Sequence, residues 1–210
     1  ITLIISLSMS MSTFAQYAAA SYVVLNEGSE NDYLQLESVW QAYHKEAIAM
    51  GRKVGWSIWK IAKNGDDSYE HGTYPDYLIL EQYSSKEQMD EEFVRYGEDY
   101  EGMKAIMKKN LKGKYSNKQI ENILAKAPKK EVRTYIHERV TSTPMTNGDV
   151  KVGDVMVATA MEQLRDDYEQ FETEFYSDLF AQNIIKGNHR FWGFSRIIDR
   201  NEAAYSAPTH

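Results

Sequence analysis

The chain of 210 residues contains no cysteine. It therefore has no disulfide, thiolate metal site, cysteine nucleophile or iron–sulfur cluster built from its own side chains. Basic residues are outnumbered, with 24 Lys and Arg against 31 Asp and Glu and a formal net charge of −7. This balance argues against a nucleic-acid or anionic-membrane partner, because such surfaces attract basic proteins.

Sequence motifs that identify common enzymes are missing as well. No HExxH motif and no histidine pair with the spacing of a helical metal site is present, so we expect no metal site. The glycines form neither a GxGxxG loop nor a P-loop, and no GxSxG elbow occurs. We therefore expect no cofactor. With 42% hydrophobic and 26% charged residues, the composition is that of an ordinary globular protein.

The first segment, 1–20, is uncharged and apolar, with small residues at Thr13 and Ala15 before Gln16. This pattern is typical of a secretory signal peptide and its cleavage site. The alternative is a buried first strand. A basic segment and an initiator methionine are missing ahead of it, so we expect the sequence to be a fragment at this end. We also expect an exported bacterial protein, periplasmic or extracellular, with no membrane span in the mature chain.

A helix, a glycine stop and an aromatic strand follow one another over 31–61. Apolar side chains recur every three or four residues, at Tyr33, Leu36, Trp40, Tyr43, Ala47 and Met50. This spacing predicts a helix with one buried face. Gly51 supplies the helix stop, and the alternating stretch 54–61 predicts a strand.

Around this helix the sequence predicts a complete α+β unit. Strands are expected over 21–26, 54–61, 74–83 and 129–141, and a short acidic helix over 86–96. The stretch 97–127 interrupts this order with two further helical patterns, the second of which opens with a capping box of Ser116 and Gln119. A linker rich in turn residues occupies 142–153.

After the linker the pattern restarts, with a strand predicted over 154–159, a helix over 162–186 and an aromatic strand over 191–198. The helix carries an apolar stripe at Tyr168, Phe171, Phe175, Leu179, Gln182 and Ile185. Then the copy stops, without its third strand, second helix and fourth strand. We therefore expect a fragment at this end too, or a sheet that another chain completes.

The order strand–helix–strand–strand–helix–strand is that of the ferredoxin-like split βαβ unit. In the stretches 22–61, 74–83 and 154–198 the chain resembles the dimeric α+β barrel superfamily. The resemblance implies ferredoxin-like units in tandem, a first unit over 21–141 and an incomplete second unit over 154–210. It also implies that two units pair through their sheets, as an intramolecular pseudo-dimer or a homodimer. The inserted helices depart from the superfamily pattern, and no residue matches a catalytic motif of its members.

Candidate site residues gather in the first helix and the strand after it. The chain has five histidines, His44, His71, His137, His189 and His210. His44 lies beside the helix stripe, and with Tyr43 it is a candidate for acid–base chemistry, against the alternative of a half-buried structural histidine. Trp40, Trp56 and Trp59 are candidates for binding a flat apolar ligand, against the alternative of core and interface packing. Alternation places Trp56 and Trp59 on opposite faces of their strand.

These features leave two hypotheses of different classes. The first is an exported protein that binds a small apolar ligand or a partner and has no catalysis of its own. The second, which the superfamily resemblance suggests, is a cofactor-free monooxygenase-like enzyme acting on a small aromatic substrate. In that enzyme Tyr43 or His44 would assist proton transfer, and Trp40 and Trp56 would hold the ring. The second copy has Leu179 in place of His44, so the aromatic pattern common to both copies is best explained by packing.

Overall fold

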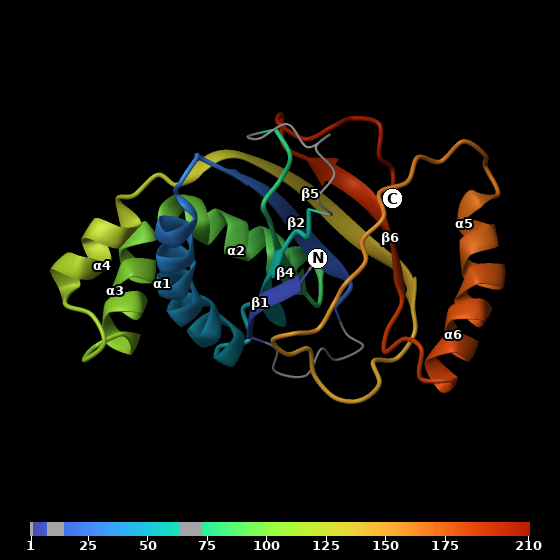
Figure 1. Ribbon diagram of the computed structural model, residues 1–210, viewed down its shortest axis with the longest axis horizontal. Helices are drawn as coiled ribbons and strands as arrows, with labels where there is room; N and C mark the ends of the chain where they lie inside the picture. The colour runs from blue at the N-terminus through green and yellow to red at the C-terminus, as the bar shows by residue number, and fades with distance from the viewer. Residues whose placement is uncertain (1, 8–14, 64–72) are drawn as a thin grey trace.

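The computed structural model describes residues 2–7, 15–63 and 73–210, the first of these segments by its backbone alone (Figure 1). It is an α+β fold. In chain order the elements are β1 (Thr2–Leu7), β2 (Tyr17–Leu25), α1 (Glu30–Ala49), β3 (Gly55–Lys60), β4 (Tyr77–Tyr83), α2 (Lys86–Glu98), α3 (Tyr100–Asn110), α4 (Asn117–Leu124), β5 (Lys129–Ser142), α5 (Tyr168–Phe171), a π-helical segment η1 (Glu172–Tyr176), α6 (Ser177–Ile185) and β6 (Gly193–Arg200). Because α5, η1 and α6 form one continuous helix, five helices lie within the described ranges.

Five of the described strands form one open antiparallel sheet in the order β3-β4-β2-β5-β6, and β1 pairs with the outer edge of β3. β2 lies at the centre, with Val23 opposite Tyr77 of β4 and Val132 of β5. The strands predicted at 54–61, 74–83 and 129–141 are confirmed within a few residues. The strand predicted at 21–26 is also present, but it begins four residues earlier, at Tyr17.

One face of the sheet is covered by α1 and α2. Tyr33 of α1 packs against Val23 and Tyr77, and Met89 of α2 packs against Tyr83. Tyr77 and Tyr83 are an even number of residues apart on β4, so their side chains point to the same face. Both helices therefore bury apolar side chains against one side of the sheet.

The two predicted inserted helices are confirmed as α3 and α4, which pack on a second side of α1, next to the side that faces the sheet. The predicted capping box is present: the Gln119 N–H donates to Ser116 Oγ, and the Ser116 N–H donates to Gln119 Oε1. The cluster between α1 and these helices contains Leu36, Val39, Tyr43, Ala47, Met103, Met107, Leu111, Ile120 and Ile123. Because α1 is buried on two sides, the single stripe predicted for it was incomplete, and its last member, Met50, is exposed.

The chain after β5 crosses the other face of the sheet, where Val150 packs with Trp59 and Leu78. Figure 1 shows this segment in orange, running across the strands on its way to α5. The strand predicted at 154–159 is not formed, and that prediction was wrong. The segment lies across the sheet face, where no ladder of backbone hydrogen bonds is available, and Val155 and Val157 are largely exposed.

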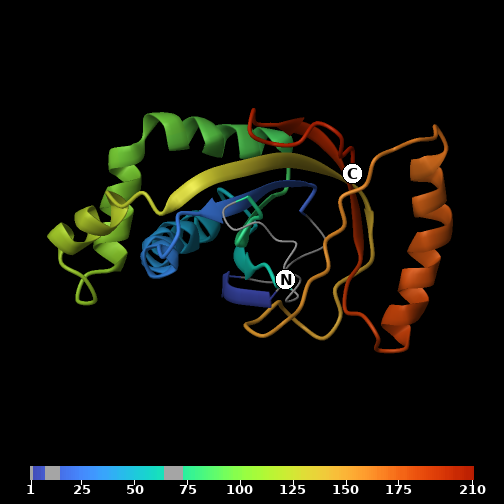
Figure 2. The same ribbon diagram turned by 45° about the horizontal axis from the view of Figure 1, so that its top comes forward.

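The second half of the chain extends the first sheet. β6 pairs antiparallel with β5, with Ser195 opposite Arg139. Figure 2 shows α5 and α6 standing beyond β6, at the opposite end of the molecule from α1, α3 and α4. The described residues form one open sheet, and tandem ferredoxin-like units are not shown.

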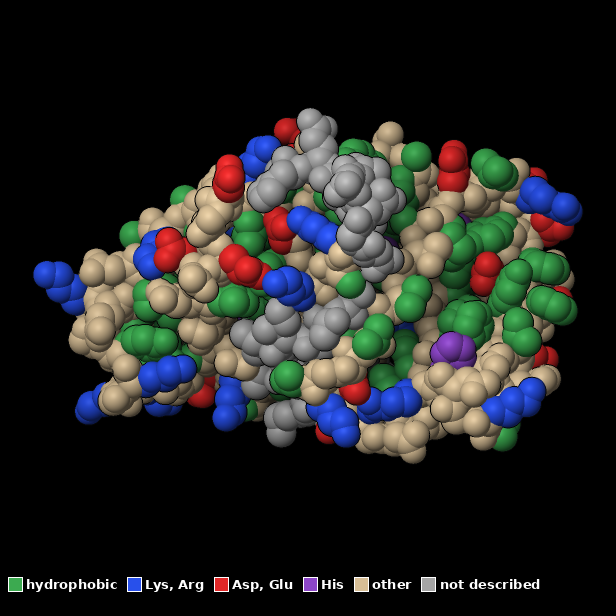
Figure 3. Space-filling view, viewed as in Figure 1, with side chains coloured by type: hydrophobic (Ala, Val, Ile, Leu, Met, Phe, Trp, Pro, Cys, Tyr) green, Lys and Arg blue, Asp and Glu red, His purple; other side chains and the backbone are tan. Residues whose placement is uncertain are grey.

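The helix of this half contacts β6 through Tyr168 and Phe180, whose rings lie against Phe194 and Trp192. Of the predicted apolar stripe, Tyr168 therefore packs on the sheet, whereas Phe171, Phe175, Leu179 and Ile185 are exposed. Figure 3 shows hydrophobic side chains gathered over this region. These side chains are exposed because no described strand or helix covers the outer side of this helix.

Candidate functional site

Four of the five candidate residues lie close together on the helix-covered face. His44 is buried and stacks on Trp56, with ring centroids 4.6 Å apart and planes 18° apart. The Trp40 ring is 6.0 Å from both His44 and Tyr43. Trp59 lies on the other face, and its Nε1–H donates to Ser57 Oγ. The prediction that the strand tryptophans point to opposite faces is confirmed.

A buried lysine that the sequence analysis did not single out lies at the centre of this group. Lys53 is 1% exposed, and its Nζ lies 3.2 Å from His44 Nδ1. Nζ also donates to Glu81 Oε2 and to the Tyr96 hydroxyl, and Glu92 Oε1 is 3.6 Å away. Gly51, with a φ of 71°, turns the chain after α1 and so directs Lys53 back under the helix.

Three tyrosines complete the group, which we call the Lys53 cluster. It contains Tyr43, His44, Lys53, Glu81, Tyr83, Glu92 and Tyr96. The Tyr96 hydroxyl donates to Glu81 Oε2 at 2.5 Å, and the Tyr83 hydroxyl donates to the same Oε2 atom at 3.0 Å. The Tyr43 hydroxyl donates to Glu92 Oε1 at 2.5 Å. The cluster thus links α1, the turn before β3, β4 and α2.

Charges within the Lys53 cluster favour definite protonation states. Burial alone would raise the pKa of Glu81, but the charge and hydrogen bond of Lys53, with His44 and Tyr96, lower that pKa to about 2. Burial and the neighbouring Lys53 hold the pKa of His44 well below its usual value. At neutral pH Glu81 is therefore a carboxylate, and His44 is a neutral ring whose Nδ1 can accept from the ammonium.

The three ammonium protons of Lys53 have three acceptors nearby, in Glu81, Tyr96 and His44. In this arrangement all three N–H donors of Lys53 are used, so none is left to bind a ligand.

The sequence contained a signal that could have revealed the Lys53 cluster. In the strand YLILEQY, Glu81 has the same phase as Tyr77 and Ile79, so an acid occupies a position whose face is buried. A buried carboxylate requires a cationic or hydrogen-bonding partner.

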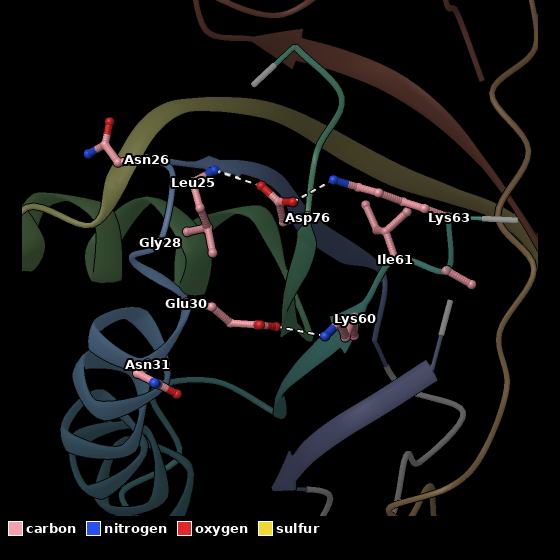
Figure 4. Close-up of a pocket in the computed structure, with 10 residues that line it drawn as sticks. Leu25, Asn26, Gly28, Glu30, Asn31, Lys60, Ile61, Lys63 and Asp76 are labelled. Carbon is pink, nitrogen blue, oxygen red and sulfur yellow. Dashed lines mark hydrogen bonds and ion pairs between the residues drawn. The ribbon is translucent and has the colours of Figure 1, made fainter. Parts of the chain in front are cut away.

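A separate hollow of about 590 Å³ lies near the start of α1, at the far end of β2 (Figure 4). It is lined by Leu25, Asn26, Gly28, Glu30, Asn31, Lys60, Ile61, Ala62, Lys63 and Asp76. Two ion pairs flank it. Lys60 Nζ lies 2.7 Å from Glu30 Oε1, and Lys63 Nζ lies 2.6 Å from Asp76 Oδ1.

The other histidines are dispersed. His137 lies on β5, and burial and then Arg139 lower its pKa to about 4. His189 contacts Phe180, and His210 Nε2 lies 3.0 Å from Glu169 Oε1. His71 lies outside the described residues. Within residues 2–7, 15–63 and 73–210, no group of three or more His, Asp or Glu is placed to hold a metal ion.

Comparisons with known proteins identify no relative. No family model matches the chain, and no curated protein matches its sequence. Among the described helices, none is both long and apolar enough to cross a membrane. The fold and the side-chain geometry are therefore the basis for the functional proposals.

Proposed function

We propose that this protein binds a small ligand and has no catalysis of its own, and that the ligand occupies the hollow beside α1. The hollow supports this proposal because its volume, about 590 Å³, falls within the roughly 300–1,000 Å³ of small-molecule sites. Leu25 and Ile61 supply apolar surface, and the Glu30–Lys60 pair supplies charge at the rim. Such a lining fits a ligand with an apolar body and a polar group.

The tryptophan candidates support binding less directly. Trp56 is 1% exposed and Trp59 5%, each packed against protein. A ligand could reach either ring only after side chains around it had moved. Trp40 is half-buried and is the most accessible of the three. The hollow, by contrast, is open with its ion pairs formed, so binding there needs no rearrangement of the core.

Ligand screening with matched variants tests this proposal. Native mass spectrometry would identify small molecules that co-purify with the full chain, and calorimetry would measure their affinity. Ala62→Trp places a large ring at the hollow, whereas Ala203→Trp makes the same change at an exposed turn far along the chain. Binding should be lost in the first variant and kept in the second. Equal binding by both variants would exclude the hollow as the site.

A second candidate function is a cofactor-free monooxygenase-like enzyme, which the gathering of perturbed groups around His44 supports. His44 would remove a proton from an activated aromatic CH₂ group through Nδ1, in place of its contact with Lys53, and Tyr43 would assist that transfer. O₂ would add to the resulting carbanion, and loss of water would leave a carbonyl, so that one oxygen atom enters the substrate and the other forms water. Oxygen uptake with hydroxylated aromatic substrates tests this, since His44→Ala should abolish it and His189→Ala should not.

We also propose that the protein is exported after cleavage between Ala15 and Gln16. β2 begins at Tyr17, so this cleavage would leave the strand intact, whereas cleavage after Ala20 would remove the buried Ala19 and Ala20. Intact-mass analysis of the protein secreted by a bacterial host measures the new N-terminus. A secreted product that begins at Ser21 would contradict the proposed site.

The tandem ferredoxin-like arrangement, paired within the chain or between two copies, remains our proposal. Its support is the strand order β3-β4-β2-β5 with α1 after β2 and α2 after β4, which is the order of a split βαβ unit. The exposed stripe on α5–α6 is consistent with a second unit whose sheet is absent from the described residues. Light scattering measures the mass in solution, and a dimer that Phe175→Glu dissociates would support pairing between copies.

A further inference from the structure

Arg139 is a second cation on the sheet, on the face opposite α1 and α2, with a partly exposed side chain whose Nε is buried. Its guanidinium lies beneath the Phe191 ring, with Cζ 5.4 Å from the ring centroid. The backbone of Gly193 lies beside both groups, since an added Cβ would be 2.8 Å from Nη1 of Arg139 and 3.0 Å from the Phe191 ring. Phe191 and Gly193 therefore hold the guanidinium plane in place.

This guanidinium has no acceptor in the part of the chain that the structure describes. Its Nε is buried with no hydrogen-bond partner, and no described carboxylate lies within ion-pair distance. Arg133, Arg190 and Arg196, in contrast, each have a carboxylate, on Glu131, Asp154 and Glu169 respectively. Burial lowers the pKa of Arg139, but an arginine stays charged in proteins. A buried N–H without an acceptor is unfavourable, and an anion would supply that acceptor.

The neighbours of Arg139 supply further donors. His137 is two residues away on β5, so its side chain points to the same face, about 7 Å along the strand. No described residue forms a hydrogen bond with its ring, which is neutral at pH 7 and retains one N–H. Ser195, opposite Arg139 on β6, lies on this face too. The segment between β5 and α5, which crosses this face, supplies no described partner for Arg139. Its Asp154 pairs with Arg190 instead.

We propose that Arg139, with His137 beside it, binds the oxyanion of a small ligand, a carboxylate or a phosphate. The guanidinium presents paired N–H donors at the spacing of two such oxygens. The site is distinct from the hollow beside α1. Arg139 is level with Gln16 at one end of β2, and the hollow begins at Leu25 at the other end, about 30 Å away along the strand.

Titration calorimetry of the full chain with inorganic phosphate and, separately, with benzoate tests the proposal in a buffer free of other oxyanions. Each anion is taken to about 10 mM, the weak limit of specific binding. Binding of phosphate assigns the site to phosphorylated ligands, and binding of benzoate assigns it to carboxylates. If neither anion binds the wild-type chain, the proposal is wrong.

Two variants locate the binding. Arg139→Gln should weaken it by at least about tenfold, since a charge-assisted bidentate contact is lost. Arg165→Gln, which removes an exposed arginine paired with Asp167, should bind like the wild type. Equal weakening in both variants would show a general charge effect and overturn the assignment, as would unchanged binding in Arg139→Gln.

A third variant separates binding from folding. Gly193→Ala keeps the charge of Arg139 but puts a methyl group against its guanidinium. We expect weaker anion binding with an unchanged circular dichroism spectrum. Phosphate or benzoate, whichever binds, should raise the melting temperature of the wild type and not that of Arg139→Gln. A rise of equal size in Arg139→Gln would place the anion elsewhere.

Discussion

Lys53 is a buried cation on one face of the sheet and Arg139 is a partly exposed cation on the other, and the two differ in their partners. Lys53 has two carboxylates, a hydroxyl and a ring nitrogen within reach. Arg139 contacts the Phe191 ring and the Gly193 backbone, and its guanidinium has no described hydrogen-bond acceptor. A buried charge with full partners holds elements together, whereas a partly exposed charge without them is open to an anion.

The difference follows from what covers each face. On the Lys53 side, α1, α2 and β4 bring acids and hydroxyls together from three regular elements. On the Arg139 side the cover is an irregular segment, and its Asp154 is already bound by Arg190. The first face therefore contains a closed polar network, and the second retains an unpaired donor.

Removing the paired cation should have the largest effect. Lys53→Met would leave Glu81 and Glu92 without their ammonium, and we expect it to lower the free energy of unfolding by about 3–5 kcal/mol. Lys60→Met, at a half-exposed lysine paired with Glu30, should cost about 1 kcal/mol or less. Urea denaturation followed by circular dichroism measures both. Equal costs would contradict a structural role for the Lys53 cluster.

Acid should weaken the same network. The pKa of Glu81 is about 2 in the folded protein against an ordinary 4.5, so the unfolded chain binds the proton first as the pH falls. Its stabilising effect is complete above about pH 4.5 and is lost towards pH 2, by about 3 kcal/mol in all.

Unfolding free energies measured across this range should therefore fall less steeply for Glu81→Gln than for the wild type. Glu202→Gln, at an exposed position, should follow the wild-type curve. Parallel curves for Glu81→Gln and the wild type would show that the carboxyl of Glu81 is not stabilised by its neighbours.

Removing the unpaired cation should have the smallest effect, of opposite sign. Arg139→Met takes away a buried Nε–H that has no described acceptor, so we expect the free energy of unfolding to rise by about 1 kcal/mol in a buffer without oxyanions. Arg196→Met breaks a half-exposed pair with Glu169 and should lower it by about 1 kcal/mol or less. A clear loss of stability in Arg139→Met would mean that this arginine is already satisfied.

Much of the architecture followed from local patterns. The capping box of Ser116, the inserted helices and the alternation that separates Trp56 from Trp59 depend on residues near one another in the chain, and all were predictable. Periodicity also located the helix around Phe171 and Phe175, although it did not show which side would be covered. That side depends on strands distant in the sequence, and the described chain places none there.

The candidate site, like the fold, was predictable from the sequence only in part. Sequence spacing brought Tyr43 and His44 into consideration, because both lie on one helix and precede an aromatic strand. It could not show that Lys53 would meet Glu81, 28 residues away, or that Arg139 would meet no acid among the described residues. Spacing along the chain decides which side chains share a face, whereas the partners of a buried charge come from other elements, and only the packing of those elements brings them within hydrogen-bond distance.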